Sequence, residues 1–110
     1  MIEVVPILHV NDAERASTWW ARLGFEQESV HRFFDGAPAF VSMRHGDSRV
    51  FLSEHQGDAR PDTLLYLWVD DLDRIASEFE VESQTAGWDE GVHEVELTDP
   101  DGNRLRIGQR

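Results

Sequence analysis

The sequence predicts an α+β fold made of two tandem βαβββ modules, and the main observation behind this prediction is an internal repeat. The segment 6–20 (PILHVNDAERASTWW) is matched in outline by 65–79 (LYLWVDDLDRIASEF), and each copy has the pattern of a strand followed by a capped helix. A second pair, 46–52 (GDSRVFL) and 101–107 (DGNRLRI), joins a polar turn to a strand. With 110 residues the chain is long enough for one ordinary core, so both copies are expected to belong to a single domain.

The first module, residues 1–57, contains one expected helix between strands. Asn11 or Asp12 can cap this helix, because their side-chain oxygens accept hydrogen bonds from its first N–H groups. Gly24 is expected just after its end, where glycine adopts a left-handed conformation without strain. The expected core face of the helix comprises Ala16, Trp19 or Trp20, and Leu23. The expected strands are residues 4–10, 25–34, 40–44 and 49–54.

The second module, residues 62–110, repeats this order after a loop at 55–61 that is rich in polar residues, glycine and proline. Asp70 or Asp71 can cap its helix, which is expected to continue to about residue 80. The expected strands are residues 63–69, 81–85, 92–97 and 104–107.

Charge restricts the partners of the chain. It has 22 Asp and Glu residues against 10 basic residues, all of them arginine, and a formal net charge of −12. Such a charge repels nucleic acid and anionic membranes, so neither is an expected partner. Fourteen of the carboxylates lie in residues 58–110 and eight in residues 1–57, so a ligand site in the second half is expected to favour cations.

Nothing in the sequence predicts a membrane span or secretion. The chain has no apolar run long enough to cross a bilayer, and its first residues (MIEVVPILHV) lack the basic start of a signal peptide. A cytoplasmic location is therefore expected. The absence of cysteine excludes disulfides, thiolate metal sites and cysteine nucleophiles.

Several motifs occur in an order that resembles the vicinal oxygen chelate superfamily of glyoxalases, bleomycin resistance proteins and extradiol dioxygenases. They are ARLGFE at 21–26, the HGD turn at 45–47, TLLYLWVDDLD at 63–73 and LTDPDGNRLRIG at 97–108. Within the superfamily the chain is most similar to the bleomycin resistance proteins, over nearly all of its length. This resemblance implies that the two modules form a cupped, barrel-like mixed sheet and that the chain assembles as a homodimer.

The resemblance also indicates where a metal ion would be bound, because the metal enzymes of the superfamily place their ligands on the first and last strands of each module. This chain has Val5, Phe51, Leu64 and Arg106 at the matching positions. Valine, leucine and phenylalanine have no lone pair to donate, and arginine is always protonated. We therefore expect no metal, no other cofactor and no catalytic residue, and a binding protein rather than an enzyme.

Aromatic and aliphatic side chains occupy the expected ligand surface instead. On the strand 63–69, the alternation of side chains directs Leu64, Tyr66 and Trp68 to one face. Phe51, on an earlier strand, is expected to join them. The result is a surface rich in aromatic rings, which can stack on a planar ligand and attract its cations.

The resemblance adds further candidates. Phe40 matches a phenylalanine that stacks on the ligand in bleomycin resistance proteins, and Trp88 lies near a tryptophan that covers the drug. Carboxylates such as Asp89 and Glu94 are expected to attract the amines of a ligand. The expected ligand-binding residues are Phe34, Phe40, Phe51, Glu54, Tyr66, Trp68, Trp88 and Glu90.

These residues predict a protein that sequesters a cationic aromatic antibiotic such as bleomycin without modifying it. One alternative is a glyoxalase-like lyase or dioxygenase that binds a metal through His9, His55 or a carboxylate. Another is a binder of a smaller metabolite, because the connection 82–94 is shorter than the loop that helps to wall the groove of bleomycin resistance proteins.

Overall fold

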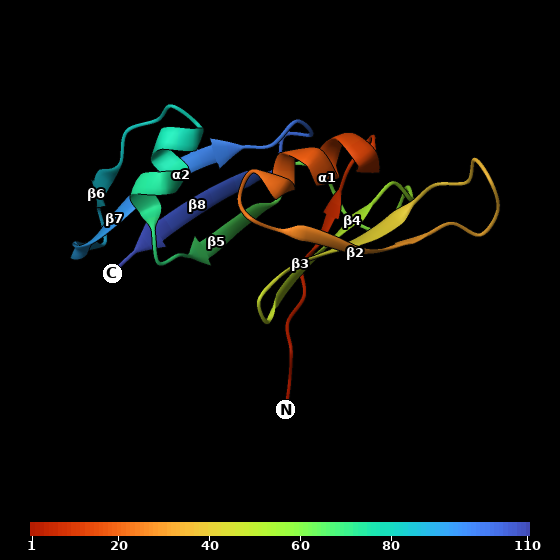
Figure 1. Ribbon diagram of the computed structural model, residues 1–110, viewed down its shortest axis with the longest axis horizontal. Coiled ribbons are helices and arrows are strands. Elements are labelled where there is room, and N and C mark those ends of the chain that lie inside the picture. Colours follow the sequence, from red (N-terminus) through yellow and green to blue (C-terminus); the bar gives the residue numbers. More distant parts are fainter. The chain divides into compact units, whose positions relative to one another are not determined.

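In the computed structural model, which describes residues 1–110, the chain forms two four-stranded sheets with one helix each (Figure 1). The elements are β1 (Ile7–His9), α1 (Ala13–Ala21), β2 (Glu26–His31), β3 (Phe40–His45), β4 (Ser48–Ser53), β5 (Leu64–Trp68), α2 (Leu72–Glu78), β6 (Gln84–Ala86), β7 (Asp89–Thr98) and β8 (Arg104–Gln109). The predicted α+β class and the βαβββ order of both modules are confirmed. Neither helix has the length and apolar character needed to cross a membrane.

The chain divides into two compact units. Unit 1 comprises Met1–Thr63 and Pro100–Asn103, and unit 2 comprises Leu64–Asp99 and Arg104–Arg110. Unit 1 therefore contains the elements from β1 to β4 together with the turn that connects β7 to β8. Unit 2 contains the remaining strands and α2.

The sheet of unit 1 has the strand order β1-β4-β3-β2, and only β1 and β4 run parallel. Helix α1 packs against β2, β3 and β4. It begins after Asp12, whose carboxylate accepts hydrogen bonds from the N–H groups of Glu14 and Arg15, and Gly24 beyond its end has a positive φ of 95°. Trp20 rather than Trp19 is the tryptophan of this core. The buried side chains include Leu8, Val10, Ala16, Trp20, Val41, Met43, Val50 and Leu52.

The sheet of unit 2 has the equivalent order β5-β8-β7-β6, with β5 parallel to β8. Helix α2 packs against β7 and β8. The carboxylate of Asp71 caps it by accepting a hydrogen bond from the N–H of Arg74. The buried side chains of this unit include Leu72, Ile75, Val92, Val95, Leu97, Leu105 and Ile107.

Each sheet is covered by its helix on one face only. Along β5, Leu64, Tyr66 and Trp68 are exposed, whereas Leu65 and Leu67 are less exposed. This alternation follows from the period of two in a strand, which sends successive side chains to opposite faces. The open face of each sheet is therefore where large side chains remain accessible to a ligand.

Four strands differ most from the predicted ranges. One of them is β2, which ends at His31 rather than at residue 34. β1 begins at Ile7 rather than at residue 4, and Pro6 just before it has no N–H group to donate to a neighbouring strand. β6 begins at Gln84 rather than at residue 81, and Glu80, just after α2, has a positive φ of 54°. β7 is longer than predicted, because its first residue, Asp89, already pairs with β6.

The turn residues 100–103 (PDGN), which belong to unit 1, are joined to the rest of that unit by side-chain hydrogen bonds. Asn103 is completely buried. Its Nδ2 donates to the carbonyl of His9 at 3.0 Å, and its Oδ1 accepts from the N–H of Thr63 at 3.3 Å. Asp101 accepts a hydrogen bond from the N–H of Asn11 at 2.9 Å. Position 103 therefore requires a short side chain with both a hydrogen-bond donor and a hydrogen-bond acceptor, and asparagine provides both.

We predict that Asn103→Asp destabilises the protein by about 3 kcal/mol, because the donor facing the His9 carbonyl becomes a buried acceptor that carries a charge. Urea denaturation followed by circular dichroism measures this change. Asn11→Ala, at an exposed asparagine, is the control and is expected to cost less than about 0.5 kcal/mol. Equal unfolding midpoints for the two variants would contradict this role of Asn103.

Candidate functional site

The open face of the sheet in unit 2 carries a cluster of three aromatic rings. Tyr66 and Trp68 project from β5, and Trp88 lies in the turn between β6 and β7. The ring centroids of Tyr66 and Trp68 are 5.0 Å apart, those of Tyr66 and Trp88 are 6.0 Å apart, and those of Trp68 and Trp88 are 6.1 Å apart. The exposed fractions are 37% for Tyr66, 43% for Trp68 and 59% for Trp88. Three of the predicted residues are thus brought together on one accessible surface, which we call the aromatic face.

The Glu94 carboxylate holds two of these rings. Its Oε2 accepts a hydrogen bond from the Tyr66 hydroxyl at 2.7 Å and another from Trp88 Nε1 at 3.1 Å. Hydrogen bonds to a charged acceptor are stronger than those between neutral groups. Glu94 thus fixes the orientation of rings from two different elements, which preorganises the aromatic face before any ligand arrives.

Gly108 makes the Glu94–Tyr66 contact sterically possible. In the strand order β5-β8-β7, Gly108 on β8 lies opposite Trp68 on one side and Glu94 on the other. A Cβ atom at residue 108 would lie 2.1 Å from the Tyr66 hydroxyl oxygen and 2.9 Å from Tyr66 Cζ. Only glycine therefore lets the tyrosine side chain cross β8 to reach β7.

Charged groups of both signs surround the rings. By strand register Glu94 and Glu96 share the aromatic face with Arg104 and Arg106. Both of these arginines lie 3.6 Å from one oxygen of Glu96. The guanidinium carbon of Arg110 lies 3.8 Å from the centroid of the Trp68 ring, which is a cation–π contact.

Part of the acidic excess of the second half lies on and around α2. Six of its carboxylates fall in the segment 70–82, which holds α2 and the residues that flank it. Glu94 and Glu96, from the same half, lie on the aromatic face itself.

The predicted residues of unit 1 are not all on one surface. Phe40 and Phe51 form a ring pair with centroids 5.2 Å apart on the open face of their sheet. Phe34 is 70% exposed and is not part of this pair. Its neighbour Phe33 instead contacts the ring of His31 at 4.8 Å, a contact that sequence reasoning missed.

Glu54 has a structural role. Its Oε2 accepts a hydrogen bond from the N–H of Ala13 at 2.7 Å, and its Oε1 accepts one from the N–H of Ala39 at 2.8 Å. These bonds join the start of α1 to the segment before β3, and they occupy both carboxylate oxygens. Glu90, by contrast, lies exposed on β7.

The positions that carry metal ligands in the superfamily enzymes do not fit a metal here. Phe51 packs against Phe40, Leu64 is 41% exposed on the aromatic face, and Arg106 pairs with Glu96. No group of three His, Asp or Glu side chains is arranged to hold a metal ion. His9 lies 3.3 Å from the side-chain oxygen of Asn11, so it interacts locally.

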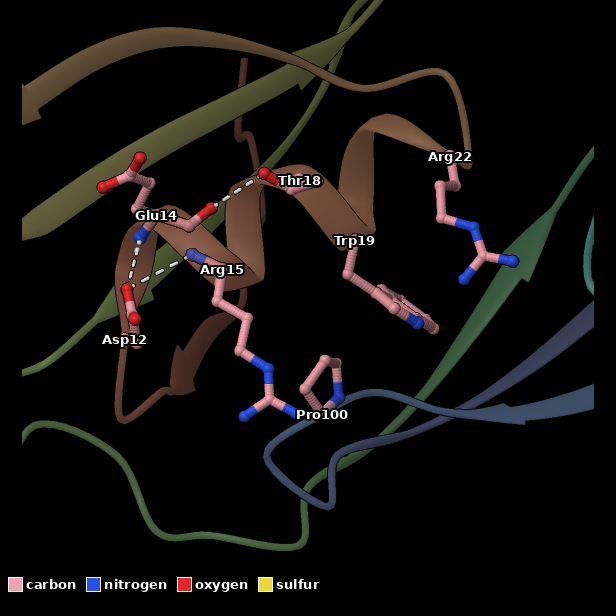
Figure 2. A pocket seen from close by; sticks show the side chains of 7 residues that line it. All are labelled: Asp12, Glu14, Arg15, Thr18, Trp19, Arg22 and Pro100. Carbon is pink, nitrogen blue, oxygen red and sulfur yellow. Dashed lines mark hydrogen bonds between the residues drawn. The ribbon is translucent and has the colours of Figure 1, made fainter.

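An open pocket with a volume of about 500 Å³ lies beside α1 in unit 1 (Figure 2). The residues that line it are Asp12, Glu14, Arg15, Thr18, Trp19, Arg22 and Pro100. Arg15, Trp19 and Arg22 extend to the same side of the helix (Figure 2). Asp12 is engaged in capping the helix. The pocket contains none of the predicted ligand-binding residues, and its two acidic and two basic side chains balance in charge.

Tyr66 provides a specific probe of the aromatic face, because it is the only tyrosine in the chain. Burial of the hydroxyl, and then its hydrogen bond to Glu94, raise the pKa of Tyr66 to about 12. A raised pKa means that this environment stabilises the fold fully below the unfolded pKa of about 10, and that this stabilisation is lost as the pH rises through the folded value.

We predict that absorbance at the tyrosinate band gives a midpoint near pH 12 for the folded protein. The midpoint should fall in Glu94→Gln, which removes the charge, and in Gly108→Ala, which displaces the ring. Circular dichroism at each pH serves as the control for unfolding. A midpoint near the ordinary value of about 10 in protein that is still folded would contradict the described contact.

Comparisons with known proteins agree with this architecture. The model of the family described as glyoxalase superfamily proteins matches residues 1–110. No curated protein matches the sequence. A solved bleomycin-binding protein complexed with bleomycin has a TM-score of 0.73 at 21% identity, with 100% of this chain and 99% of that chain covered.

Two further solved structures are similar over the same extent. A bleomycin resistance determinant encoded on the transposon Tn5 has a TM-score of 0.74 at 22% identity, and 100% of this chain and 98% of that chain are covered. A glyoxalase/bleomycin resistance protein from Catenulispora acidiphila has a TM-score of 0.71 at 20% identity, with 100% and 99% covered. At these identities the shared feature is the fold. The family match over the whole sequence shows that this chain belongs to the glyoxalase superfamily.

Proposed function

We propose that this protein binds a small, cationic, partly planar aromatic molecule such as bleomycin and holds it without chemical change. The observation that carries the proposal is the aromatic face of Tyr66, Trp68 and Trp88. Large rings with exposed fractions of 37% to 59% would normally be buried in a protein of this size. An exposed apolar cluster of this kind is typical of a binding surface.

The geometry of the rings favours a planar ligand. Their centroids lie 5.0 to 6.1 Å apart and their planes are tilted by 56° to 76°, so they form walls rather than a flat stack. A heteroaromatic group between such walls can make stacked and edge-to-face contacts, worth about 0.5 to 1.5 kcal/mol for each well-placed ring. The solved bleomycin-binding protein complexed with bleomycin has the same fold, which supports a ligand of this class.

Other residues are proposed as secondary contacts. Phe40 and Phe51 offer a second ring pair in unit 1, Phe34 is an exposed ring in the loop before β3, and Glu90 is a carboxylate near Trp88 in sequence. Glu54 is not included, because both of its oxygens accept hydrogen bonds from the backbone. The open character of the aromatic face would also accept a ligand smaller than bleomycin.

We predict that Trp68→Ala weakens the binding of bleomycin at least about tenfold, because the Trp68 ring lies next to both of the other rings and is 43% exposed. Glu90→Gln should weaken it less than about twofold, since an exposed charge is screened by salt. Trp19→Phe, at the α1 pocket, is the matched tryptophan control and should have no effect. Titration calorimetry gives all three values. No measurable heat for the unaltered protein would remove bleomycin as the ligand.

The same titration separates a binder from an enzyme of the superfamily. With EDTA present the affinity should be unchanged, because the residues at the superfamily's ligand positions cannot hold a metal. Mass spectrometry of the recovered ligand should give its original mass. A modified product, or binding that is lost on chelation and restored by one metal per chain, would favour the lyase or dioxygenase alternative.

We also propose that the chain forms a homodimer. Strand β1 is at the edge of its sheet, and the segment before it exposes the apolar side chains of Ile2 (90%) and Val4 (86%). Edge strands and exposed apolar segments are common sites of self-association.

Light scattering at micromolar concentration should give twice the chain mass of 12.6 kDa, and a double substitution of Ile2 and Val4 by Glu should shift the protein toward the monomer. A monomeric unaltered protein would contradict the proposal.

A further inference from the structure

Arg110 differs from the other arginines of the aromatic face in its contacts. Arg104 and Arg106 share the carboxylate of Glu96, at 3.6 Å each. Arg110 forms no ion pair, and its guanidinium carbon instead lies 3.8 Å from the centroid of the Trp68 ring. At this distance a planar guanidinium is in van der Waals contact with the indole.

The Trp68 ring is well suited to receive a cation. Tyr66 and Trp88 lie beside it with their planes tilted by 56° and 76°, so their rings do not stack flat on it. Trp68 remains 43% exposed even with Arg110 in place. Tryptophan has the most favourable ring for cation–π contacts. A cation from solution would therefore compete for the surface that Arg110 covers.

We infer that the Trp68 ring is the cation subsite of this protein and that Arg110 fills it in the absence of ligand. The inference rests on the proposed function and specifies the ligand further: it carries a guanidinium, amidine or ammonium group next to its planar part. Displacing Arg110 breaks no salt bridge, because the arginine has no carboxylate partner. The Arg110 side chain can therefore leave the Trp68 ring at a small cost in free energy. In this way Arg110 regulates the access of a ligand cation to the subsite.

Under such competition, the apparent affinity for a ligand equals the intrinsic affinity multiplied by the fraction of molecules in which the subsite is free. An exposed cation–π contact of ordinary strength corresponds to a reduction of roughly threefold to sixfold. Removal of the Arg110 guanidinium should therefore strengthen the binding of a cationic ligand, although the substitution removes a contact from the folded protein.

Benzamidine, a planar aromatic cation, is a suitable probe. Titration followed by the indole N–H signals in ¹⁵N-correlated spectra should give an affinity for Arg110→Ala that is roughly threefold to sixfold higher than for the unaltered protein. Arg106→Ala removes the same charge from the same face without uncovering Trp68, and it should change the affinity by less than about 1.5-fold. Arg110→Lys, which keeps the charge and a weaker cation–π group, should fall between the two.

A second measurement needs no ligand. In the unaltered protein the δ-methylene protons of Arg110 should be shifted upfield by the ring current of Trp68, and this shift should vanish in Trp68→Ala. Absence of the upfield shift, an equal gain in affinity for the alanine variants at 106 and 110, or no gain in Arg110→Ala would each overturn the inference.

These outcomes are separate from those that test the proposed function. If benzamidine responds as expected but bleomycin does not bind, the cation subsite stands and bleomycin is the wrong ligand. If bleomycin binds to the aromatic face with unchanged affinity in Arg110→Ala, the proposed function stands and the inference about Arg110 is wrong.

Discussion

Each sheet of this protein has a single helix, and one helix covers only one face of a four-stranded sheet. The covered faces hold the aliphatic core, which buries side chains such as Leu52 and Leu105 completely. The opposite faces must remain in contact with water or with a partner. In unit 2 that face carries Tyr66 and Trp68, whose rings would contribute more to stability if they were buried. The arrangement of helices thus creates the surface on which the proposed function depends.

On that surface, one carboxylate and one glycine set the positions of the rings. Glu94 accepts hydrogen bonds from Tyr66 and Trp88, which come from separate segments of the chain. Gly108 leaves the space that Tyr66 needs to reach Glu94 across β8. Because Glu94 Oε2 already accepts two hydrogen bonds, the carboxylate serves more to position the two rings than to attract a ligand as a free anion. This arrangement explains how an acidic protein can present a largely aromatic face.

Much of the fold could be predicted from the sequence, because its signals are local. Asp12 and Asp71 cap helices, and Gly24 follows the first helix with a positive φ. Alternation in the strand 63–69 correctly grouped Tyr66 with Trp68 on an exposed face. Trp88 was found through the family resemblance, and the structure brings it within 6.1 Å of Trp68.

The supporting contacts could not be predicted, since they depend on strand order and register. The need for glycine at 108 follows only when β8 is known to lie between β5 and β7. Glu54 was expected to attract a ligand but binds the backbone at Ala13 and Ala39, which are distant in sequence. The contact of Arg110 with Trp68 likewise joins the residue that follows β8 to strand β5. Net charge by residue range also does not show which surface carries the carboxylates: six of the fourteen in residues 58–110 lie in the segment 70–82, whereas Glu94 and Glu96 lie on the aromatic face.

The most direct test of this account uses the four tryptophans as reporters. Trp68 and Trp88 belong to the aromatic face, whereas Trp19 lines the α1 pocket and Trp20 is buried in the core of unit 1. In ¹⁵N-correlated spectra each indole gives one N–H signal, which can be assigned by single Trp→Phe substitutions. Addition of bleomycin should shift the signals of Trp68 and Trp88 and leave those of Trp19 and Trp20 unchanged. Shifts confined to Trp19, or no shift at any indole at saturating ligand, would contradict the assignment of the aromatic face as the binding surface.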